Sequence, residues 1–320
     1  MKSILRGLLA GLAVALALPA WAQQYPSKTV RMIISFQPGG ITDVLARQLA
    51  QKLAENLGQS VIVENRPGGN FIIAADAAAK AEPDGHTLFM AVDSTFTLNP
   101  LQSVKLPYDY QKDFAPISLV GLQSLFIVAS SKAPGKSLME VISAARSNPG
   151  KVTFGSSALV AQLIGEQIKQ AYGVDMLHVP FKGSPPMLQA LLASDIDFAI
   201  TTFTPYANFV KEGKLHGLAV TGSARDANAP DSPTLAEIGK PELTYRLWFG
   251  MFAPAATPKP ILQRLHAEFV KVLADPVIRQ RVIATGVEPM SSTPEQMDKI
   301  VKDDLAKWSR LVKETGIKLQ

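Results

Sequence analysis

The sequence VRMIISFQPGGITDVLARQLAQKLAENLGQSVIVE, residues 30–64, decides the fold. Residues 30–36 are mostly apolar, which is typical of a strand covered on both faces within a parallel sheet. After Pro38-Gly39-Gly40, leucines recur every four residues from Leu45 to Leu57 and predict an amphipathic helix. Residues 61–63 are again β-branched, so the stretch predicts a βαβ unit. Its glycine turn lies at a helix N-terminus, where free N–H groups and the helix dipole favour an anion.

The N-terminal residues 1–22 have the features of a secretory signal peptide. Lys2 and Arg6 precede an apolar run, and Ala20-Trp21-Ala22 forms a small-x-small cleavage site. We therefore expect cleavage after Ala22 and a mature chain in the periplasm. The apolar run is shorter than the roughly 20 residues that span a bilayer, and no later run is longer, so a soluble mature chain is expected.

Composition excludes several classes of site. The sequence has no cysteine, which excludes disulfides, thiolate metal sites and a cysteine nucleophile. Its formal net charge is +5 without a block of like charges, so nucleic acid is not an expected partner. The four histidines are scattered without ligand spacing, so we expect neither a metal nor a cofactor.

The order of elements in the first unit recurs in the second half of the chain, without residue-level identity. A small polar turn at Gly155-Ser156-Ser157 precedes a predicted helix at 159–172, and a later predicted strand ends at Thr201-Thr202. The chain is also longer than one hydrophobic core usually serves, so two domains are expected. The predicted closing helices at 259–274 and 294–315 need a sheet to cover, and we assign both to the first domain.

The expected fold is therefore α/β, with two Rossmann-like lobes joined by crossing strands around a cleft. We expect the first lobe to comprise residues 23–124 and 226–320, and the second lobe residues 125–225. In open α/β sheets ligands bind beyond the carboxyl ends of the strands. Two helix N-termini would then converge on one cleft, which favours a small anion held by backbone and hydroxyl groups.

Candidate ligand contacts follow from this placement. On the first wall they are Phe36, Gly39, Gly40, Thr42, Asp43, Ser94 and Thr95, and on the second Ser156, Ser157, Thr201, Thr202 and Phe203. Asp43 has two interpretations that the sequence leaves open, a helix cap or a contact with the ligand. We expect Gly40 either to approach the ligand closely or to adopt a positive φ.

Several motifs together resemble one known family. They are Gln37-Pro38-Gly39-Gly40-Ile41-Thr42-Asp43, Asn65-Arg66-Pro67-Gly68, Pro83-Asp84-Gly85, His178-Val179-Pro180-Phe181-Lys182-Gly183 and Phe249-Gly250-Met251-Phe252-Ala253-Pro254. In this order they resemble the periplasmic solute-binding proteins of tripartite tricarboxylate transporters, the Bordetella uptake gene (Bug) type. The resemblance covers essentially the whole mature chain. It implies a two-lobed monomer of type II topology without catalytic residues, which closes on a small carboxylate, with bridging waters, and delivers it to membrane permease subunits.

Two turns depart from the family pattern. The second-lobe turn usually reads Ser-Gly-x-Gly followed by a His-Leu pair, whereas residues 157–163 lack both glycines and place Gln162 where the histidine falls. After Arg66-Pro67 the family usually has an alanine and further glycines, and this chain reads Gly68-Gly69-Asn70-Phe71. Gln162 therefore joins the candidate ligand contacts, and the identity of the ligand does not carry over from the resemblance.

Two alternatives belong to other functional classes. A ligand-loaded sensor subunit for a membrane histidine kinase would have the same sequence features as a transport receptor. A secreted hydrolase is the other alternative, although Gly155-Ser156-Ser157-Ala158 lacks the G-x-S-x-G spacing of a nucleophile elbow.

Overall fold

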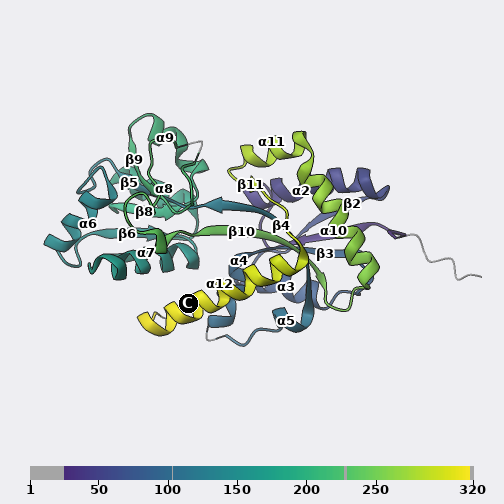
Figure 1. Ribbon diagram of the computed structural model, residues 1–320. Coiled ribbons are helices and arrows are strands. Elements are labelled where there is room, and N and C mark those ends of the chain that lie inside the picture. The colour runs from purple at the N-terminus through teal and green to yellow at the C-terminus, as the bar shows by residue number, and fades with distance from the viewer. Residues whose placement is uncertain (1–24, 103, 227–228, 318–320) are drawn as a thin grey trace, which may run out of the picture.

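The computed structural model describes residues 25–102, 104–226 and 229–317 as two α/β lobes side by side (Figure 1). The predicted signal peptide and its cleavage site lie outside these residues. Within the described ranges, none of the helices combines the length and the apolar character needed to cross a membrane.

The first lobe is built on a six-stranded sheet in the order β11-β4-β10-β3-β1-β2. Its strands are β1 (Val30–Ile34), β2 (Val61–Asn65), β3 (Thr87–Val92), β4 (Phe114–Ser124), β10 (Arg246–Pro254) and β11 (Glu288–Pro289). The helices of this lobe are α2 (Ile41–Leu57), α3 (Ile72–Ala79), α4 (Asp93–Thr97), α5 (Tyr110–Asp113), α10 (Lys259–Ala274) and α11 (Pro276–Ala284). Strand β1 pairs in parallel with β2 and β3, and β10 runs antiparallel to β3 and β4.

The second lobe has a five-stranded sheet in the order β7-β6-β8-β5-β9. The strands are β5 (Phe126–Ser130), β6 (Thr153–Ser156), β7 (Leu177–Pro180), β8 (Phe198–Thr201) and β9 (Leu215–Val220). The helices are α6 (Leu138–Ser147), α7 (Leu159–Tyr172), α8 (Ser184–Ala193) and α9 (Ala207–Lys211). In each sheet, one strand that arrives from the other lobe is inserted antiparallel beside the third local strand, which is the type II arrangement.

The first βαβ unit forms as its periodicity predicts. Leu45, Leu49 and Leu53 of α2 are fully buried in the core that the helix shares with β1 and β3. Burial of each such side chain stabilises the fold by about 1.5–3 kcal/mol. Gly58 ends the helix in the left-handed conformation at φ 69°. The helix start is thereby fixed at the carboxyl ends of β1 and β3.

The chain crosses between the lobes at two points that touch each other. Leu125 alone separates β4 from β5, and Tyr245 directly precedes β10. The buried Thr221 joins both crossings: the Leu125 N–H donates to its Oγ1 at 2.9 Å, and the Tyr245 N–H donates to its carbonyl oxygen at 2.8 Å. Hydrogen bonds to Thr221 therefore link the two crossing segments to each other.

The return crossing lies later in the chain than residue 226. Leu235 and Leu243 are buried in the core of the second lobe, and Thr234 forms a parallel bridge with Val220 of β9. Few apolar residues mark this segment, which is why its composition resembles that of a linker. We propose that the second lobe extends to Tyr245 and that the first lobe resumes at Arg246.

The last helix, α12 (Pro294–Thr315), spans both lobes (Figure 1). It opens with the predicted capping box between Thr293 and Gln296. Met297 and Val301 pack in the first lobe, but Trp308 belongs to the core of the second. The expectation that both closing helices cover only the first lobe is therefore wrong for α12, because at 22 residues this helix is long enough to reach the other core.

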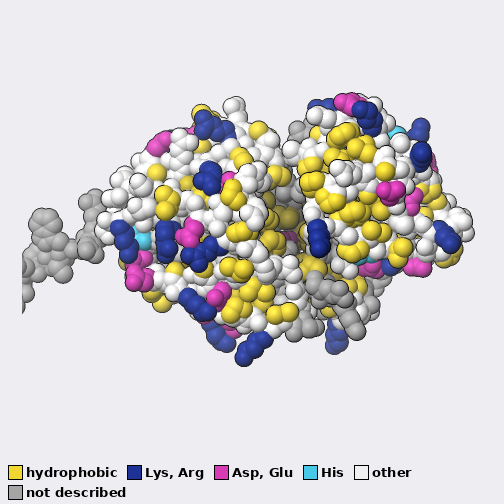
Figure 2. Space-filling model, turned by 180° about the vertical axis from the view of Figure 1, so that it is seen from behind, with side chains coloured by type: hydrophobic (Ala, Val, Ile, Leu, Met, Phe, Trp, Pro, Cys, Tyr) yellow, Lys and Arg dark blue, Asp and Glu magenta, His cyan; other side chains and the backbone are white. Residues whose placement is uncertain are grey.

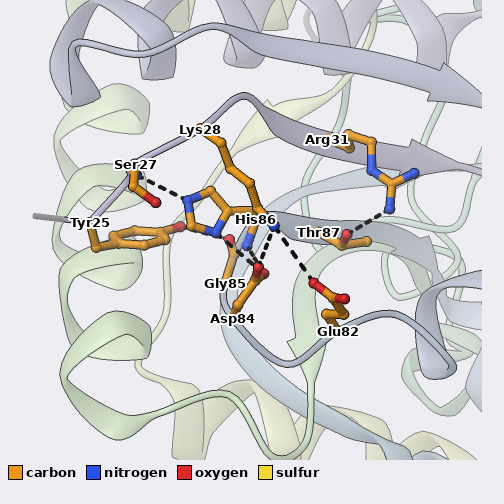
Figure 3. A network of polar contacts seen from close by, with 9 residues as sticks. All are labelled: Tyr25, Ser27, Lys28, Arg31, Glu82, Asp84, Gly85, His86 and Thr87. Atoms are coloured by element: carbon orange, nitrogen blue, oxygen red, sulfur yellow. Dashed lines mark hydrogen bonds and ion pairs between the residues drawn. The ribbon is translucent and has the colours of Figure 1, made fainter. Parts of the chain in front are cut away.

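The beginning of the described chain is fixed by a polar network at the amino ends of β1 and β3 (Figure 3). The Tyr25 hydroxyl donates to the Gly85 carbonyl oxygen at 2.7 Å, and the Ser27 N–H donates to Nε2 of His86 at 3.1 Å. The Lys28 ammonium pairs with Asp84 at 2.8 Å. These contacts hold the segment before β1 against the turn before β3, so His86 has a structural role.

We predict that Gly85→Ala destabilises this end of the lobe. Gly85 has φ +81°, and a Cβ there would lie 2.4 Å from Ile261 and 2.9 Å from the Tyr25 ring. Crowding of this kind costs about 1–3 kcal/mol in addition to the backbone strain. Gly58→Ala is the control, since its φ is +69° but its Cβ would meet nothing within 4 Å. Urea unfolding should show the larger loss for Gly85→Ala, and equal losses would contradict the crowding argument.

Candidate functional site

A cleft of about 830 Å³ lies between the two lobes. The space-filling view shows this furrow with hydrophobic side chains on both sides (Figure 2). Its walls come from the carboxyl ends of strands, the starts of helices and the crossing strands. The lining residues used below are Phe36, Ile41, Thr42, Asn70, Phe71, Asp93, Ser94, Asn99, Gln123, Ser156, Ser157, Leu159, Val160, Gln162, His178, Phe181, Thr202, Leu247 and Phe249.

Two long helices begin at the cleft, one from each lobe. Helix α2 starts at Ile41 after the N-cap Gly40, and α7 starts at Leu159 after the N-cap Ala158. Neither N-cap residue makes a side-chain cap hydrogen bond, so the first-turn N–H groups remain available to a ligand. Each helix start contributes about 0.3–2 kcal/mol toward an anion.

The described lining contains neither lysine nor arginine. Besides the helix starts, the lining offers hydroxyl and amide groups, among them those of Thr42, Ser157, Gln162 and Thr202. An anion in this cleft is therefore held by neutral groups and helix dipoles rather than by an ion pair.

The structure brings seven of the thirteen predicted contacts together in the lining. These are Phe36, Thr42, Ser94, Ser156, Ser157, Gln162 and Thr202. The remaining six are not part of the lining: Gly39, Gly40, Asp43, Thr95, Thr201 and Phe203. Of this second set, Gly39 and Gly40 are exposed and the other four are buried.

Asp43 is neither the N-cap of α2 nor a lining residue. Its carboxylate accepts hydrogen bonds from the Gly39 N–H at 3.0 Å, from Arg47 at 2.9 and 3.0 Å, and from Asn65 Nδ2 at 2.8 Å. Asn65 Nδ2 also donates to the Phe36 carbonyl oxygen at 3.0 Å. The Arg47 guanidinium first, with the Gly39 and Asn65 donors, lowers the pKa of this carboxyl to about 2. Asp43 thus fixes the loop that carries Phe36 into the cleft.

Gly39 rather than Gly40 has the backbone conformation that requires glycine. Gly39 has φ +88°, whereas Gly40 is extended at φ −78° and a Cβ there would approach only the Gln37 carbonyl oxygen, at 3.8 Å. The expectation of a positive φ at Gly40 is therefore wrong. The turn residue that precedes the N-cap makes the reversal, and the N-cap itself returns to the extended region.

The other three residues outside the lining face the hydrophobic interior. Phe203 stacks on Phe126 with ring centroids 4.3 Å apart. Thr95 is fully buried in α4, and its carbonyl oxygen accepts from the Tyr108 hydroxyl at 2.7 Å. Thr201 is also buried at the end of β8, and the adjacent Thr202 lines the cleft instead, because successive side chains of an extended chain point to opposite faces.

Sequence reasoning missed several lining residues, among them His178. The His178 Nε2 lies 2.8 Å from the Ser156 hydroxyl, and the imidazole packs against the Phe154 ring. Burial lowers the pKa of His178, so the ring is neutral near pH 7. Parallel pairing of β6 with β7 brings the pair together. The available signal in the sequence was that His178 lies in the predicted strand after the helix, which would pair in parallel with the strand that ends at Ser156.

Asp93 forms the floor of the cleft, although its side chain has no exposed surface. Its carboxyl contacts the N–H and hydroxyl of Ser94 and the hydroxyl of Tyr245. Burial raises the pKa of Asp93 to about 7, and the negative charge of Asp304 acts in the same direction. A protonated Asp93 removes the negative charge that would otherwise oppose an anionic ligand.

Known proteins share this sequence and architecture. Residues 45–317 match the family described as "Tripartite tricarboxylate transporter family receptor". Protein BugT of Bordetella pertussis is 34% identical over 308 residues, which are 95% of this chain and 94% of BugT. The structure of R. palustris Rpa4515 with adipate has a TM-score of 0.81 and 31% identity, covering 92% of this chain and 99% of that one. MatC from Rhodopseudomonas palustris with bound malate has a TM-score of 0.76 and 30% identity, covering 90% and 100%.

Two sheets joined by crossing strands around a cleft define a periplasmic binding protein. Within this class, the chain belongs to the tripartite tricarboxylate transporter receptor family, with BugT among its relatives. The family resemblance and the fold predicted from the sequence are confirmed. The family comprises transport receptors and not enzymes, so the hydrolase alternative is wrong, and we assign the Ser156–His178 pair to the cleft wall.

The pKa of Asp93 predicts a stability change with pH. Since this acid binds its proton more tightly in the folded state, its stabilising contribution is complete below about pH 4 and is lost as the pH rises toward 7. Asp93→Asn mimics the protonated acid, so the variant should gain stability relative to the parent between pH 4 and pH 8. Asp195→Asn, at an exposed carboxylate, is the control. A constant difference across this pH range would show that Asp93 does not titrate there.

Asp43 predicts the opposite dependence, because its pKa is depressed. Its contribution is complete above about pH 4 and is lost as the pH falls toward 2. Asp43→Asn should lose about 1–3 kcal/mol at pH 7 and approach the parent only as the pH falls to about 2. Asp303→Asn breaks only an exposed pair with Lys299, worth roughly 0.5 kcal/mol or less. Equal urea midpoints for the two variants at pH 7 would contradict the supporting role of Asp43.

Proposed function

We propose that this protein captures a small carboxylate in the periplasm and delivers it to the permease subunits of a tripartite transporter. It does so as a monomer, after removal of a signal peptide at Ala22. The observation that carries the proposal is the convergence of the α2 and α7 starts on one cleft, in which none of the described lining residues is a lysine or an arginine. Acceptor-only anions match such N–H groups, whereas sugars and cations do not.

Relatives support this ligand class. Rpa4515 is described with adipate and MatC with malate, and both of these ligands are carboxylates. A handful of charge-assisted hydrogen bonds, less the costs of association and closure, gives about −7 to −10 kcal/mol, or roughly micromolar affinity. Such an affinity suits a receptor that must also release its ligand to a permease.

The proposed contacts are the lining residues that sequence and structure both indicate. They are Phe36, Thr42, Ser94, Ser156, Ser157, Gln162 and Thr202, together with the backbone N–H groups at the starts of α2 and α7. Gly39 and Asp43 set the position of the first loop without touching the ligand. Waters that bridge the ligand to buried carbonyls are consistent with the size of the cleft.

Titration calorimetry with mono-, di- and tricarboxylates, each beside its neutral amide, tests the proposal. We expect at least one carboxylate to bind at micromolar concentration and its amide to bind far more weakly. Gln162→Ala should weaken that binding roughly tenfold, the value of about one lost hydrogen bond to a charged group. Gln51→Ala removes an exposed glutamine from the surface of α2 and should leave binding unchanged. Binding of sugars or cations in place of carboxylates would overturn the assignment.

A further inference from the structure

The walls of the cleft show which kind of carboxylate fits. We propose that the ligand carries its carboxylate on an apolar body, an aryl or alkyl group, rather than on a polar hydroxy-acid skeleton. The proposal rests on the carboxylate-binding function above and specifies the substrate class for the same site.

The cleft offers mainly apolar side chains to a ligand. Phe36, Ile41 and Phe71 of the first lobe, and Leu159 and Phe181 of the second, line it and remain partly exposed. Six polar lining residues are buried, and five are exposed or partly exposed. The buried ones are Thr42, Asp93, Ser94, Asn99, Gln123 and Ser156; the others are Asn70, Ser157, Gln162, His178 and Thr202. Partly exposed aromatic rings on both walls of a cleft favour an apolar occupant.

Phe71 is held at the cleft by an unusual backbone. Asn70 and Phe71 both have positive φ, 48° and 74°, a conformation that costs free energy in any residue other than glycine. The Asn99 side chain stabilises this turn by donating to the Asn70 carbonyl oxygen at 2.6 Å. The Phe71 ring then packs against Phe36, with ring centroids 5.0 Å apart. The fold thus maintains a strained turn whose result is a phenylalanine pair in the first wall.

The electrostatics of the lining also favour a ligand with one carboxylate on an apolar body. One carboxylate can be met by the two helix starts, but additional carboxylates would be buried in a lining without lysine or arginine. Burying an unpaired charge is costly, so each further carboxylate weakens binding unless it reaches solvent. A ligand hydroxyl that faces Phe36, Phe71 or Phe181 would likewise lose water without gaining a hydrogen-bond partner.

Calorimetry on the purified protein with phenylacetate, hexanoate, malate and citrate tests the proposal. We expect phenylacetate or hexanoate to bind at least about tenfold more tightly than malate and citrate, from the burial of their apolar groups. If malate or citrate binds more tightly than both, the apolar body is wrong and the carboxylate function stands. If phenylacetamide matches phenylacetate, the carboxylate function is wrong instead. If no carboxylate binds, both proposals fall.

Variants assign the effect to the walls. Phe71→Gly removes the ring at a position whose φ suits glycine, so the protein should stay folded, which thermal unfolding checks. It should weaken phenylacetate about tenfold and weaken malate much less. Leu159→Ala, on the opposite wall, should act in the same direction. Ile73→Ala is the matched control, since Ile73 is 51% exposed and does not line the cleft. Equal losses for phenylacetate and malate, or none, in both wall variants would overturn the proposal.

Discussion

The free N–H groups at the starts of α2 and α7 are the constraint on which the rest of the site depends. A carboxylate buried without lysine or arginine must be stabilised by helix dipoles and neutral donors. Every carboxyl group of the protein near the site must then be protonated or paired with a cation. Asp93 meets this condition through its raised pKa, and Asp43 meets it through Arg47. The electrostatics of both carboxyls therefore follow from the same requirement.

The fold delivers the two helix starts from separate lobes, so the site is complete only when the lobes are correctly placed. The crossings at Leu125 and Tyr245 share hydrogen bonds with Thr221, which limits their relative movement. Helix α12 adds a third connection. Its Trp308 ring lies edge-on to Tyr245, whose hydroxyl contacts Asp93 at the floor of the cleft. Tyr245 therefore connects the crossing segment and α12 to the residue at the floor of the cleft.

Much of this architecture could be predicted from local pattern. The leucine period of α2, the capping box of α12 and the glycine turn before Ile41 are set by neighbouring residues, and the structure contains them as expected. The role of Asp43 could be predicted only in part. Its pairing with Arg47 is local to α2, but its contact with Asn65 joins the helix to strand β2 and is not visible in the local sequence. The local sequence suggests that Asp43 is either a helix cap or a ligand contact. In the structure it is neither the N-cap of α2 nor a lining residue of the cleft.

The backbone conformation that places Phe71 in the first wall of the cleft also could not be predicted from the sequence. Nothing in Asn70-Phe71 indicates two successive positive φ values, since the residues that usually adopt them are glycines. Asn99, which is 29 residues further along the chain, stabilises the turn with its hydrogen bond to the Asn70 carbonyl oxygen. The late return crossing was missed for a related reason, because Leu235 and Leu243 are isolated apolar residues in a polar segment.

A crystal structure of the protein with a bound carboxylate measures the central claim most directly. We predict that the carboxylate oxygens lie within about 3 Å of first-turn N–H groups of α2 and α7, at Ile41 or Thr42 and at Leu159 or Val160. Lysine and arginine side chains should remain outside contact distance. A carboxylate paired with a cation such as Lys182, or bound away from both helix starts, would contradict the account.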